Sequence, residues 1–306
     1  MIKEELLSKN GTAIMKLSRT LLSFSIGERI PTITEFSRRF DLARGTIQNA
    51  LKNLINSDAI ELASKGHLGS YLVRKNNAML LQFAGITYLV GAMPLPYTKR
   101  YEGLASGIII SSENVGMTPL NLAYMRGAKS RMNMVDYGRY DFAIVSRFAA
   151  EQYISEKNTL EIALSFGKGS YTDKHVLMFR NSKNNEIRDG MKVGVDDTSY
   201  DQMELVRKVC EGKNVEYIPI EYSRTIECLQ NGDIDATVMN IDEVTDKKVP
   251  IHYADIEGYD DAKTEAVVVY SRDREEIGAL LREHINVTTV LSVQELIRKD
   301  KIIPRY

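Results

Sequence analysis

The 306-residue sequence predicts an α/β protein made of an N-terminal winged helix-turn-helix and a larger α/β body. Two short amphipathic helices and two β-type segments occupy residues 27–73, and from residue 86 onward apolar strands alternate with amphipathic helices. Charge divides in the same way. Residues 1–75 hold 12 Lys+Arg and 7 Asp+Glu, whereas the remainder holds 28 and 34. A basic head on an acidic body suits a DNA-binding protein with a separate sensing domain.

The first helix of the head begins at Thr32 or Thr34, since either hydroxyl can cap it. Glu35 follows Thr32 at the spacing of a capping box. Ile33, Phe36 and Phe40 then recur on one face, which indicates a helix that packs on a core.

The second helix covers residues 44–54 and turns Ile47, Ala50, Leu51 and Leu54 inward. Segments 59–63 and 70–73 are expected to form the two strands of a wing, with Gly66 and Gly69 in the turn. Two helices of this size cannot bury a core alone. Residues 1–24 are therefore expected to supply a third helix, interrupted at Gly11.

The segment 27–73 resembles the DNA-binding domain of the GntR family of bacterial transcription regulators. The resemblance lies in Gly-x-x-Ile-Pro-Thr at 27–32, Arg-Gly-Thr-Ile at 44–47 and the wing at 65–69, although Ala43 stands where the family usually has serine. In a winged helix the second helix enters the major groove, where Gln and Asn suit adenine and Arg suits guanine or phosphate. The predicted DNA-binding residues are Thr32, Arg38, Arg44, Thr46, Gln48, Asn49, Lys52, Lys65, Gly66 and His67.

We place the DNA-binding domain at residues 1–75, a linker at 76–85 and a ligand-binding domain at 86–306, with its second lobe at about 186–260. Residues 78–84 are apolar and must pack on something, either the body or a second copy of the chain. Operator palindromes mirror two-fold protein symmetry, so we expect a homodimer that reads half-sites about one helical turn apart, ~10 bp.

The body is expected to hold parallel sheets, with a compact βαβαβ unit at 190–245. Strands are predicted at 87–93, 142–145, 160–166, 175–179, 192–195, 215–220, 236–239 and 266–270. Helices are predicted at 97–110, 120–136, 198–210, 222–230, 274–284 and 288–300.

This order of elements resembles the two-lobed ligand-binding domain of type 2 periplasmic binding proteins. The local cues are the segments at 138–146, 192–196 and 231–236. The resemblance implies two α/β lobes joined by crossings, which we place near 179–188 and 251–265. Together with the head, the chain resembles the YhfZ-like group of regulators.

Ligands of open α/β sheets lie off the carboxyl ends of strands. That rule selects as ligand-binding residues Met93, Pro94, Tyr97, Ser146, Ser170, Tyr171, Thr198, Ser199 and Asn240. Each also has a purely structural interpretation, for example as a helix cap at Ser146, Thr198 or Ser199. A helix beginning near Thr198 favours an anion, yet Asp196, Asp197 and Asp201 crowd the same end. A small carboxylate that also carries an amine reconciles the two features.

Catalysis is not expected, because the four histidines are scattered and Lys168-Gly169-Ser170 has no evident partner base. No cofactor or metal is expected. Cys210 and Cys228 indicate reduced thiols in a cytoplasmic protein, and no apolar run has membrane length. The prediction is a transcriptional regulator that binds double-stranded DNA and senses a small-molecule effector. Two alternatives stay open: an enzyme or substrate-binding domain tethered to DNA, and a DNA-binding protein with no effector.

Overall fold

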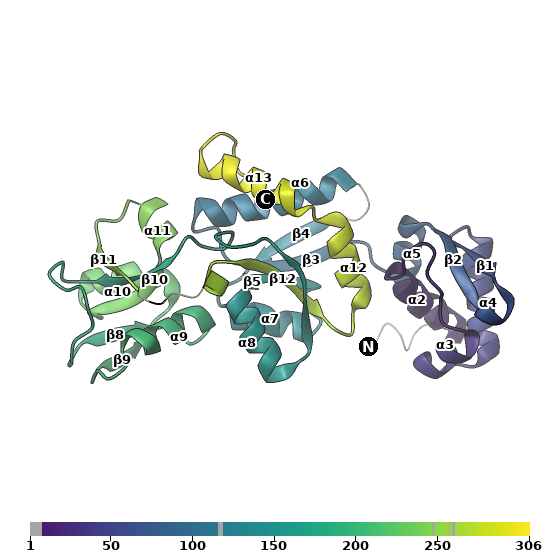
Figure 1. The fold of residues 1–306 in the computed structure, drawn as a ribbon, viewed down its shortest axis with the longest axis horizontal. Coiled ribbons are helices and arrows are strands. Elements are labelled where there is room, and N and C mark those ends of the chain that lie inside the picture. The colour runs from purple at the N-terminus through teal and green to yellow at the C-terminus, as the bar shows by residue number, and fades with distance from the viewer. Residues whose placement is uncertain (1–7, 116–118, 247, 257, 259–260) are drawn as a thin grey trace. The chain divides into compact units, whose positions relative to one another are not determined.

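The computed structural model describes residues 8–306 except 116–118, 247, 257 and 259–260. The chain forms two compact units (Figure 1). The first contains the residues up to Leu89 together with 112–120 and 274–284. The second contains 90–111, 121–273 and 285–306.

The first unit is built on three helices, α2 (Lys9–Leu22), α3 (Ile33–Phe40) and α4 (Arg44–Asn56). Their facing sides bury Leu17, Phe36 and Leu54 completely. The capping box predicted at the start of α3 is present: the Glu35 amide donates to the Thr32 hydroxyl at 3.2 Å, and the Thr32 amide donates to the Glu35 carboxylate at 2.7 Å. Gly11 lies inside α2 and does not interrupt it.

The wing consists of β1 (Ile60–Ser64) and β2 (Ser70–Lys75), paired antiparallel, with a 3₁₀ turn η1 (Gly66–Leu68) at the tip. Gly66 and Gly69 both adopt positive φ, at 59° and 93°, which explains why this short reversal uses glycine.

The expected linker folds as a helix of the first unit. Helix α5 (Asn77–Ala84) packs against α2 and buries Leu80 and Leu81. These two side chains are therefore not offered to a second copy of the chain. Helix α12 (Glu275–His284) also contacts α2, and the side-chain nitrogen Nδ2 of Asn77 donates to the Glu283 carboxylate at 3.0 Å.

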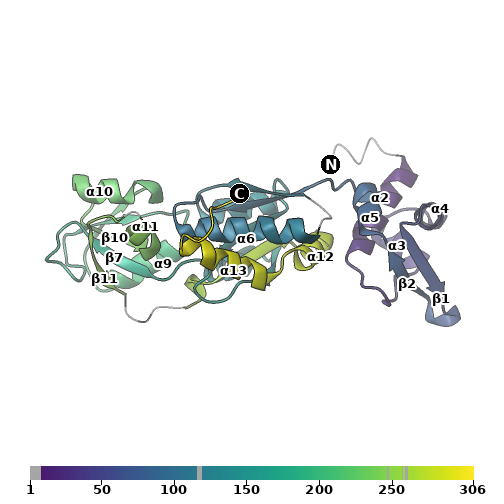
Figure 2. The same ribbon diagram turned by 90° about the horizontal axis from the view of Figure 1, so that it is seen from above.

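The second unit contains two sheets. The sheet of its first lobe has the order β4 (Leu120–Tyr124), β3 (Leu89–Met93), β5 (Phe142–Ser146), β12 (Ala266–Ser271) and β6 (Leu160–Ser165). Helices α7 (Ala128–Asp136) and α8 (Arg147–Lys157) lie on one face, while α6 (Lys99–Val115) and α13 (Val287–Arg298) lie on the other (Figures 1 and 2). Gly103 and Gly107 let α13 approach closely, because an added Cβ would lie 2.7 Å from backbone atoms of Gln294 or Val290.

The sheet of the second lobe has the order β11 (His252–Asp255), β7 (His175–Phe179), β10 (Ala236–Asn240), β8 (Lys192–Val195) and β9 (Glu216–Pro219). Strands β8, β9 and β10 are parallel and are connected through α9 (Tyr200–Val209), the 3₁₀ turn η2 (Tyr222–Arg224) and α10 (Thr225–Asn231). This is the βαβαβ unit predicted from the sequence. Helix α11 (Ile241–Asp246) follows β10, and a short 3₁₀ turn, η3 (Asp261–Lys263), precedes β12.

Three expectations for the body were wrong, and three of its elements were not predicted. Both sheets are mixed, because β12 runs antiparallel to its neighbours in one sheet and β7 does so in the other. The segment 120–136 is strand β4 followed by α7, separated at Gly127, whose φ is 75°. Helices α8 and α11 and strand β11 were not predicted. The first crossing precedes His175, since β7 already belongs to the second sheet, whereas the return crossing follows β11 within the expected range.

Within the described chain, no helix combines the length and the hydropathy needed to cross a membrane.

Candidate functional site

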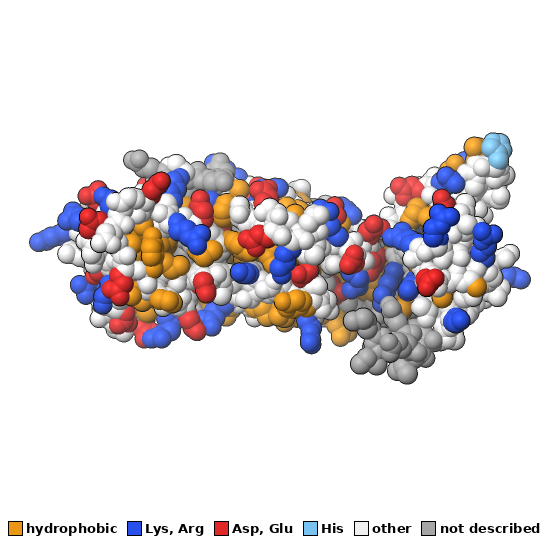
Figure 3. Space-filling model, turned by 90° about the horizontal axis from the view of Figure 1, so that it is seen from below, with side chains coloured by type: hydrophobic (Ala, Val, Ile, Leu, Met, Phe, Trp, Pro, Cys, Tyr) orange, Lys and Arg blue, Asp and Glu red, His pale blue; other side chains and the backbone are white. Residues whose placement is uncertain are grey.

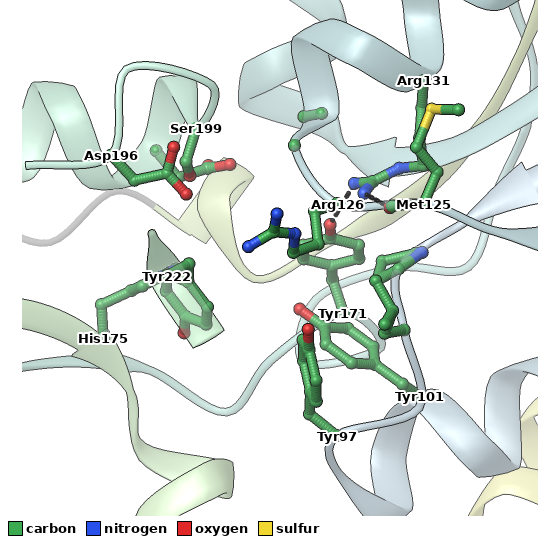
Figure 4. A pocket seen from close by; sticks show the side chains of 15 residues that line it. Tyr97, Tyr101, Met125, Arg126, Arg131, Tyr171, His175, Asp196, Ser199 and Tyr222 are labelled. Carbon is green, nitrogen blue, oxygen red and sulfur yellow. Dashed lines mark hydrogen bonds between the residues drawn. The ribbon is translucent and has the colours of Figure 1, made fainter. Parts of the chain in front are cut away.

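A pocket of about 70 Å³ opens between the two lobes of the second unit (Figure 4). On this measure a single water needs roughly 10–15 Å³, so the space is on the scale of a small molecule. Its walls come from the segments that follow β3, β4 and β8, as expected for ligand sites off strand ends. The lining residues are Pro94, Leu95, Tyr97, Tyr101, Met125, Arg126, Gly127, Ala128, Arg131, Tyr171, His175, Asp196, Ser199, Asp201 and Tyr222.

Arg131, in the first turns of α7, is the buried cation of the first-lobe wall, with 3% of its surface exposed. Its guanidinium donates to the carbonyls of Ile144 and Met125, at 3.1 and 2.8 Å, and to the Tyr171 hydroxyl at 3.0 Å. None of these acceptors is an anion, and no carboxylate among the described residues forms an ion pair with Arg131. Arginine has five N–H donors and stays charged at any ordinary pH, so two donors and a full positive charge remain available at the pocket wall.

Two carboxylates form the opposite wall at the start of α9. Asp196 accepts hydrogen bonds through one oxygen from the amide and the hydroxyl of Thr198, at 2.9 and 2.6 Å. Asp201 accepts a 2.7 Å hydrogen bond from Ser146. Burial raises the pKa of Asp201 to about 6, against the lowering effects of the Ser146 hydrogen bond and of Lys263. Figure 4 shows Asp196 and Ser199 on one side of the pocket and Arg131 on the other.

Aromatic side chains close the remaining sides. The rings of Tyr101 and Tyr171 meet edge to face with centroids 5.2 Å apart. The Tyr222 hydroxyl accepts a 3.0 Å hydrogen bond from the backbone N–H of Asn240. Burial raises the pKa of Tyr101 and Tyr222 well above that of free tyrosine, so both phenols stay neutral. Burial and Lys263 lower the pKa of His175 to about 4, so this imidazole is also neutral near pH 7.

Several contacts join the lobes beside the pocket. Arg126, after β4, donates to the Glu221 carboxylate at 2.6 Å and to the Ser223 hydroxyl at 3.0 Å, at an exposed position. Arg100 of α6 forms a buried ion pair with Asp242 of α11, with Nε 2.9 Å from the carboxylate. These contacts hold both walls of the pocket in place.

The structure brings four of the nine predicted ligand-binding residues to this pocket: Pro94, Tyr97, Tyr171 and Ser199. The other five do not line it and have structural roles or a core position. Ser146 caps α8 and donates a hydrogen bond to Asp201. The hydroxyls of Ser170 and Thr198 donate to the Gly167 carbonyl and to Asp196. The side-chain oxygen of Asn240 accepts from the Thr172 hydroxyl and the backbone amide of Asp242, and Met93 is fully buried.

The pocket residues that the prediction missed include the two arginines, Arg126 and Arg131, along with Tyr101, His175 and Tyr222. Asp196 and Asp201 were not among the predicted ligand-binding residues, although their charges favoured a ligand that carries an amine. Arg126 follows strand β4, whose sequence predicts a helix, so the rule about strand ends does not select Arg126. Arg131 lies within a helix, where only the tertiary packing decides which face meets the pocket.

The exposed surface of α4 is the candidate nucleic-acid interface. Arg44, Gln48, Asn49 and Lys52 are exposed on it, and Thr46 is half-buried. Among the described residues, Arg44 and Lys52 form no ion pair, so their charges are available to phosphate. In the space-filling view, Lys and Arg side chains are spread over the first unit (Figure 3).

The remaining predicted DNA-binding residues flank α4. Thr32 and Arg38 are exposed on α3, and Lys65, Gly66 and His67 are exposed at the wing tip. The Lys65 ammonium lies over the Tyr71 ring, 4.3 Å from its centroid. Thr32 has a structural role as the cap of α3.

In the part of the chain that the structure describes, no group of three or more His, Cys, Asp or Glu side chains could hold a metal ion. Cys210 and Cys228 are both free thiols and are buried.

Fold and site together define a two-module protein, in which a helix-turn-helix domain typical of DNA-binding regulators is joined to a domain that resembles solute-binding proteins. Comparison with known families gives the same division. Residues 25–72 match a helix-turn-helix domain family, and residues 76–306 match the YhfZ C-terminal domain. The chain therefore belongs to the YhfZ family.

One relative is the uncharacterized protein YhfZ of Escherichia coli strain K12, which is 33% identical over 310 residues, with both chains fully covered. The crystal structure of YhfZ from Shigella flexneri superposes with a TM-score of 0.61 at 33% identity, covering 75% of this chain and 98% of that one. The alkanesulfonate-binding protein SsuA from Xanthomonas axonopodis, bound to MOPS, superposes with a TM-score of 0.55 at 12% identity, over 70% and 75% of the two chains. An amino acid transporter's substrate-binding protein from Streptococcus pneumoniae, bound to L-arginine, gives 0.53 at 15% identity, over 71% and 95%. These last two likenesses show the fold alone.

Proposed function

We propose that this protein is a ligand-responsive transcriptional regulator. Its winged helix binds operator DNA, and its interlobe pocket binds a small anionic or zwitterionic metabolite that changes the affinity for that DNA. The GntR-like features of the head support the first part, and a chain that binds operator DNA works in the cytoplasm.

The observation that best supports a ligand is that Arg131 is buried at the pocket and forms no ion pair within the described residues. A buried charge without a counter-charge costs several kcal/mol, by order of magnitude, and persists only where something compensates it. Arg131 lines the pocket and has two N–H donors without an acceptor among the described residues, and a carboxylate is the acceptor that arginine binds best. A ligand carboxylate would thus complete the site.

Thermal shift with a metabolite collection on the full chain tests the proposal. A ligand at 100 times its dissociation constant adds about 2.7 kcal/mol to the free energy of unfolding. Arg131→Met should abolish the shift, whereas Arg139→Met, on the exposed surface of the first lobe, should keep it. Operator binding, with a site selected from genomic DNA, should then differ with and without the ligand.

The alternatives give different results in the same experiments. A DNA-binding protein with no effector shows no shift with any metabolite. An enzyme tethered to DNA consumes the molecule that shifts it, which mass spectrometry of the mixture detects.

A further inference from the structure

One oxygen of Asp201 is buried without a partner. The side chain is 4% exposed and lines the pocket, and its Oδ2 accepts the Ser146 hydrogen bond. Its Oδ1 is buried and has no hydrogen-bond partner among the described residues. A carboxylate oxygen without a donor loses the hydration that it had in water, so this position favours a donor supplied from outside the chain.

Asp196 presents a second carboxylate at the same wall. It is 7% exposed, and both of its hydrogen bonds from Thr198 fall on Oδ1. Within the described chain, neither Asp196 nor Asp201 forms an ion pair. Two acidic side chains therefore line the pocket, and each has one oxygen that accepts no hydrogen bond within the described residues.

The cations nearby are engaged by other groups. Lys263 forms an ion pair with Glu204, at 3.4 Å, and lies 3.6 Å from the centroid of the Phe148 ring. Arg126 is bound to Glu221. Arg131 belongs to the opposite wall, where it bonds Tyr171. Lys263 and Arg131 act on Asp201 through space and lower its pKa, but neither forms an ion pair with Asp201 or Asp196 within the described residues.

An anion is unsuited to this wall, although it lies at a helix N-terminus. The two carboxylates repel negative charge, and the Thr198 hydroxyl already donates to Asp196. A protonated amine fits instead, because its N–H groups are donors for carboxylate oxygens and its charge is compatible with the tyrosine rings that line the pocket. The elevated pKa of Asp201 agrees with this view, since a bound cation would lower it.

We infer that Asp196 and Asp201 form a cation subsite, and that the ligand is a zwitterion of amino-acid type, with its ammonium group on this wall and its carboxylate at Arg131. The inference rests on the proposed ligand-sensing function and names the chemical class of the ligand.

Two matched sets of probes test it on the full chain at pH 7.5: the standard L-amino acids, and the corresponding α-hydroxy acids, which replace only the ammonium group by a hydroxyl. We expect at least one amino acid to bind, and its hydroxy acid to bind about tenfold more weakly or worse, as measured by calorimetry. Asp201→Asn should weaken binding of that amino acid by a similar factor and leave the hydroxy acid unchanged. Asp197→Asn, at an exposed position of the same loop, is the control.

Proton release gives an independent readout. At pH 6 about half of the Asp201 side chains are protonated, so binding of an amine should release up to roughly half a proton, seen by calorimetry in two buffers of different ionisation enthalpy. Asp201→Asn should release none.

Hydroxy acids or dicarboxylates that bind as well as the amino acids overturn the cation subsite and leave the proposed sensing function intact. Unchanged affinity in Asp201→Asn, or no response to any amino acid, also overturns it. If no compound of the wider metabolite collection gives a thermal shift either, the proposed sensing function is wrong as well.

Discussion

The hydroxyl of Ser146 donates a 2.7 Å hydrogen bond to the carboxylate of Asp201, and this buried contact joins the two lobes. Ser146 is the last residue of β5 in the first lobe, and Asp201 lies in the first turn of α9 in the second. The same serine oxygen accepts the Ala149 amide at 3.1 Å and caps α8. One hydroxyl thus connects a helix start, a lobe contact and a pocket carboxylate.

Ser146→Ala should lower the free energy of unfolding by about 2 kcal/mol or more, because it removes both a helix cap and a hydrogen bond to a buried acid. Urea unfolding measures the change. Ser155→Ala is a suitable control, since the hydroxyl of Ser155 bonds only the Gln152 carbonyl at an exposed site. Equal stability of the two variants would contradict the assigned role.

Asp201 and His175 should give opposite pH dependences of stability. The pKa of Asp201 is raised to about 6 in the folded protein, so its contribution to stability falls as pH rises from about 4 to 6. The pKa of His175 is lowered to about 4, so its contribution rises between about 4 and 6.5. Each effect is on the order of 3 kcal/mol, and in the natural chain they largely cancel.

Single substitutions should separate the two effects. In Asp201→Asn the stability should rise with pH between 4 and 6.5, and in His175→Gln it should fall over the same interval. Lys263 acts on both groups, Arg131 on Asp201 and Asp242 on His175, and these charges stay in both variants. Parallel profiles of the two variants in urea unfolding would show that the pair does not titrate as described.

Arg44→Ala should weaken operator binding by about 1–3 kcal/mol and leave the fold unchanged, because the side chain is exposed on α4 and unpaired within the described residues. Fluorescence anisotropy at several salt concentrations measures it. A contact to phosphate would also reduce the salt slope by about one. The control is Arg74→Ala, since Arg74 is held by Asp58 and Glu61, both at 3.4 Å. If Arg44→Ala and Arg74→Ala bind operator DNA with equal affinity, Arg44 does not contact the DNA.

Thr32 variants should separate capping from DNA contact. Thr32→Ala should cost about 1 kcal/mol of stability, through loss of the side-chain cap of α3. Thr32→Asp keeps a capping oxygen, so its stability should stay within about 0.5 kcal/mol. Its added negative charge should nevertheless weaken binding to operator DNA if Thr32 faces a phosphate. If Thr32→Asp binds operator DNA as tightly as the natural chain, Thr32 caps α3 and does not contact the DNA.

The assembly prediction is that the protein is a homodimer on and off DNA, with half-sites about one helical turn, ~10 bp, apart. Light scattering of the full chain gives its mass, and footprinting gives the spacing. Because Leu80 and Leu81 are buried on α2, Leu80→Ala should lower stability without separating the subunits. A monomeric mass in both states would refute the prediction.

The elements of the head could be predicted because their signals are local. Thr32 and Glu35 form a cap within four residues, and the spacing of apolar residues in α4 indicates which of its faces is buried. The βαβαβ unit of the second lobe was predictable for the same reason: strand and helix periods follow one another without interruption. Strand β4 was not, because its five residues precede a helix and only their place at a sheet edge makes them a strand.

The candidate site divides in the same way. The rule that ligands lie off strand ends selected Pro94, Tyr97, Tyr171 and Ser199 from the sequence, and the structure places these four around one pocket. The burial of Arg131 beside the pocket and the hydrogen bond between Ser146 of one lobe and Asp201 of the other could not be predicted from the sequence. Those relations depend on how two sheets formed by interleaved parts of the chain pack together. The spacing of residues along the sequence does not predict that packing.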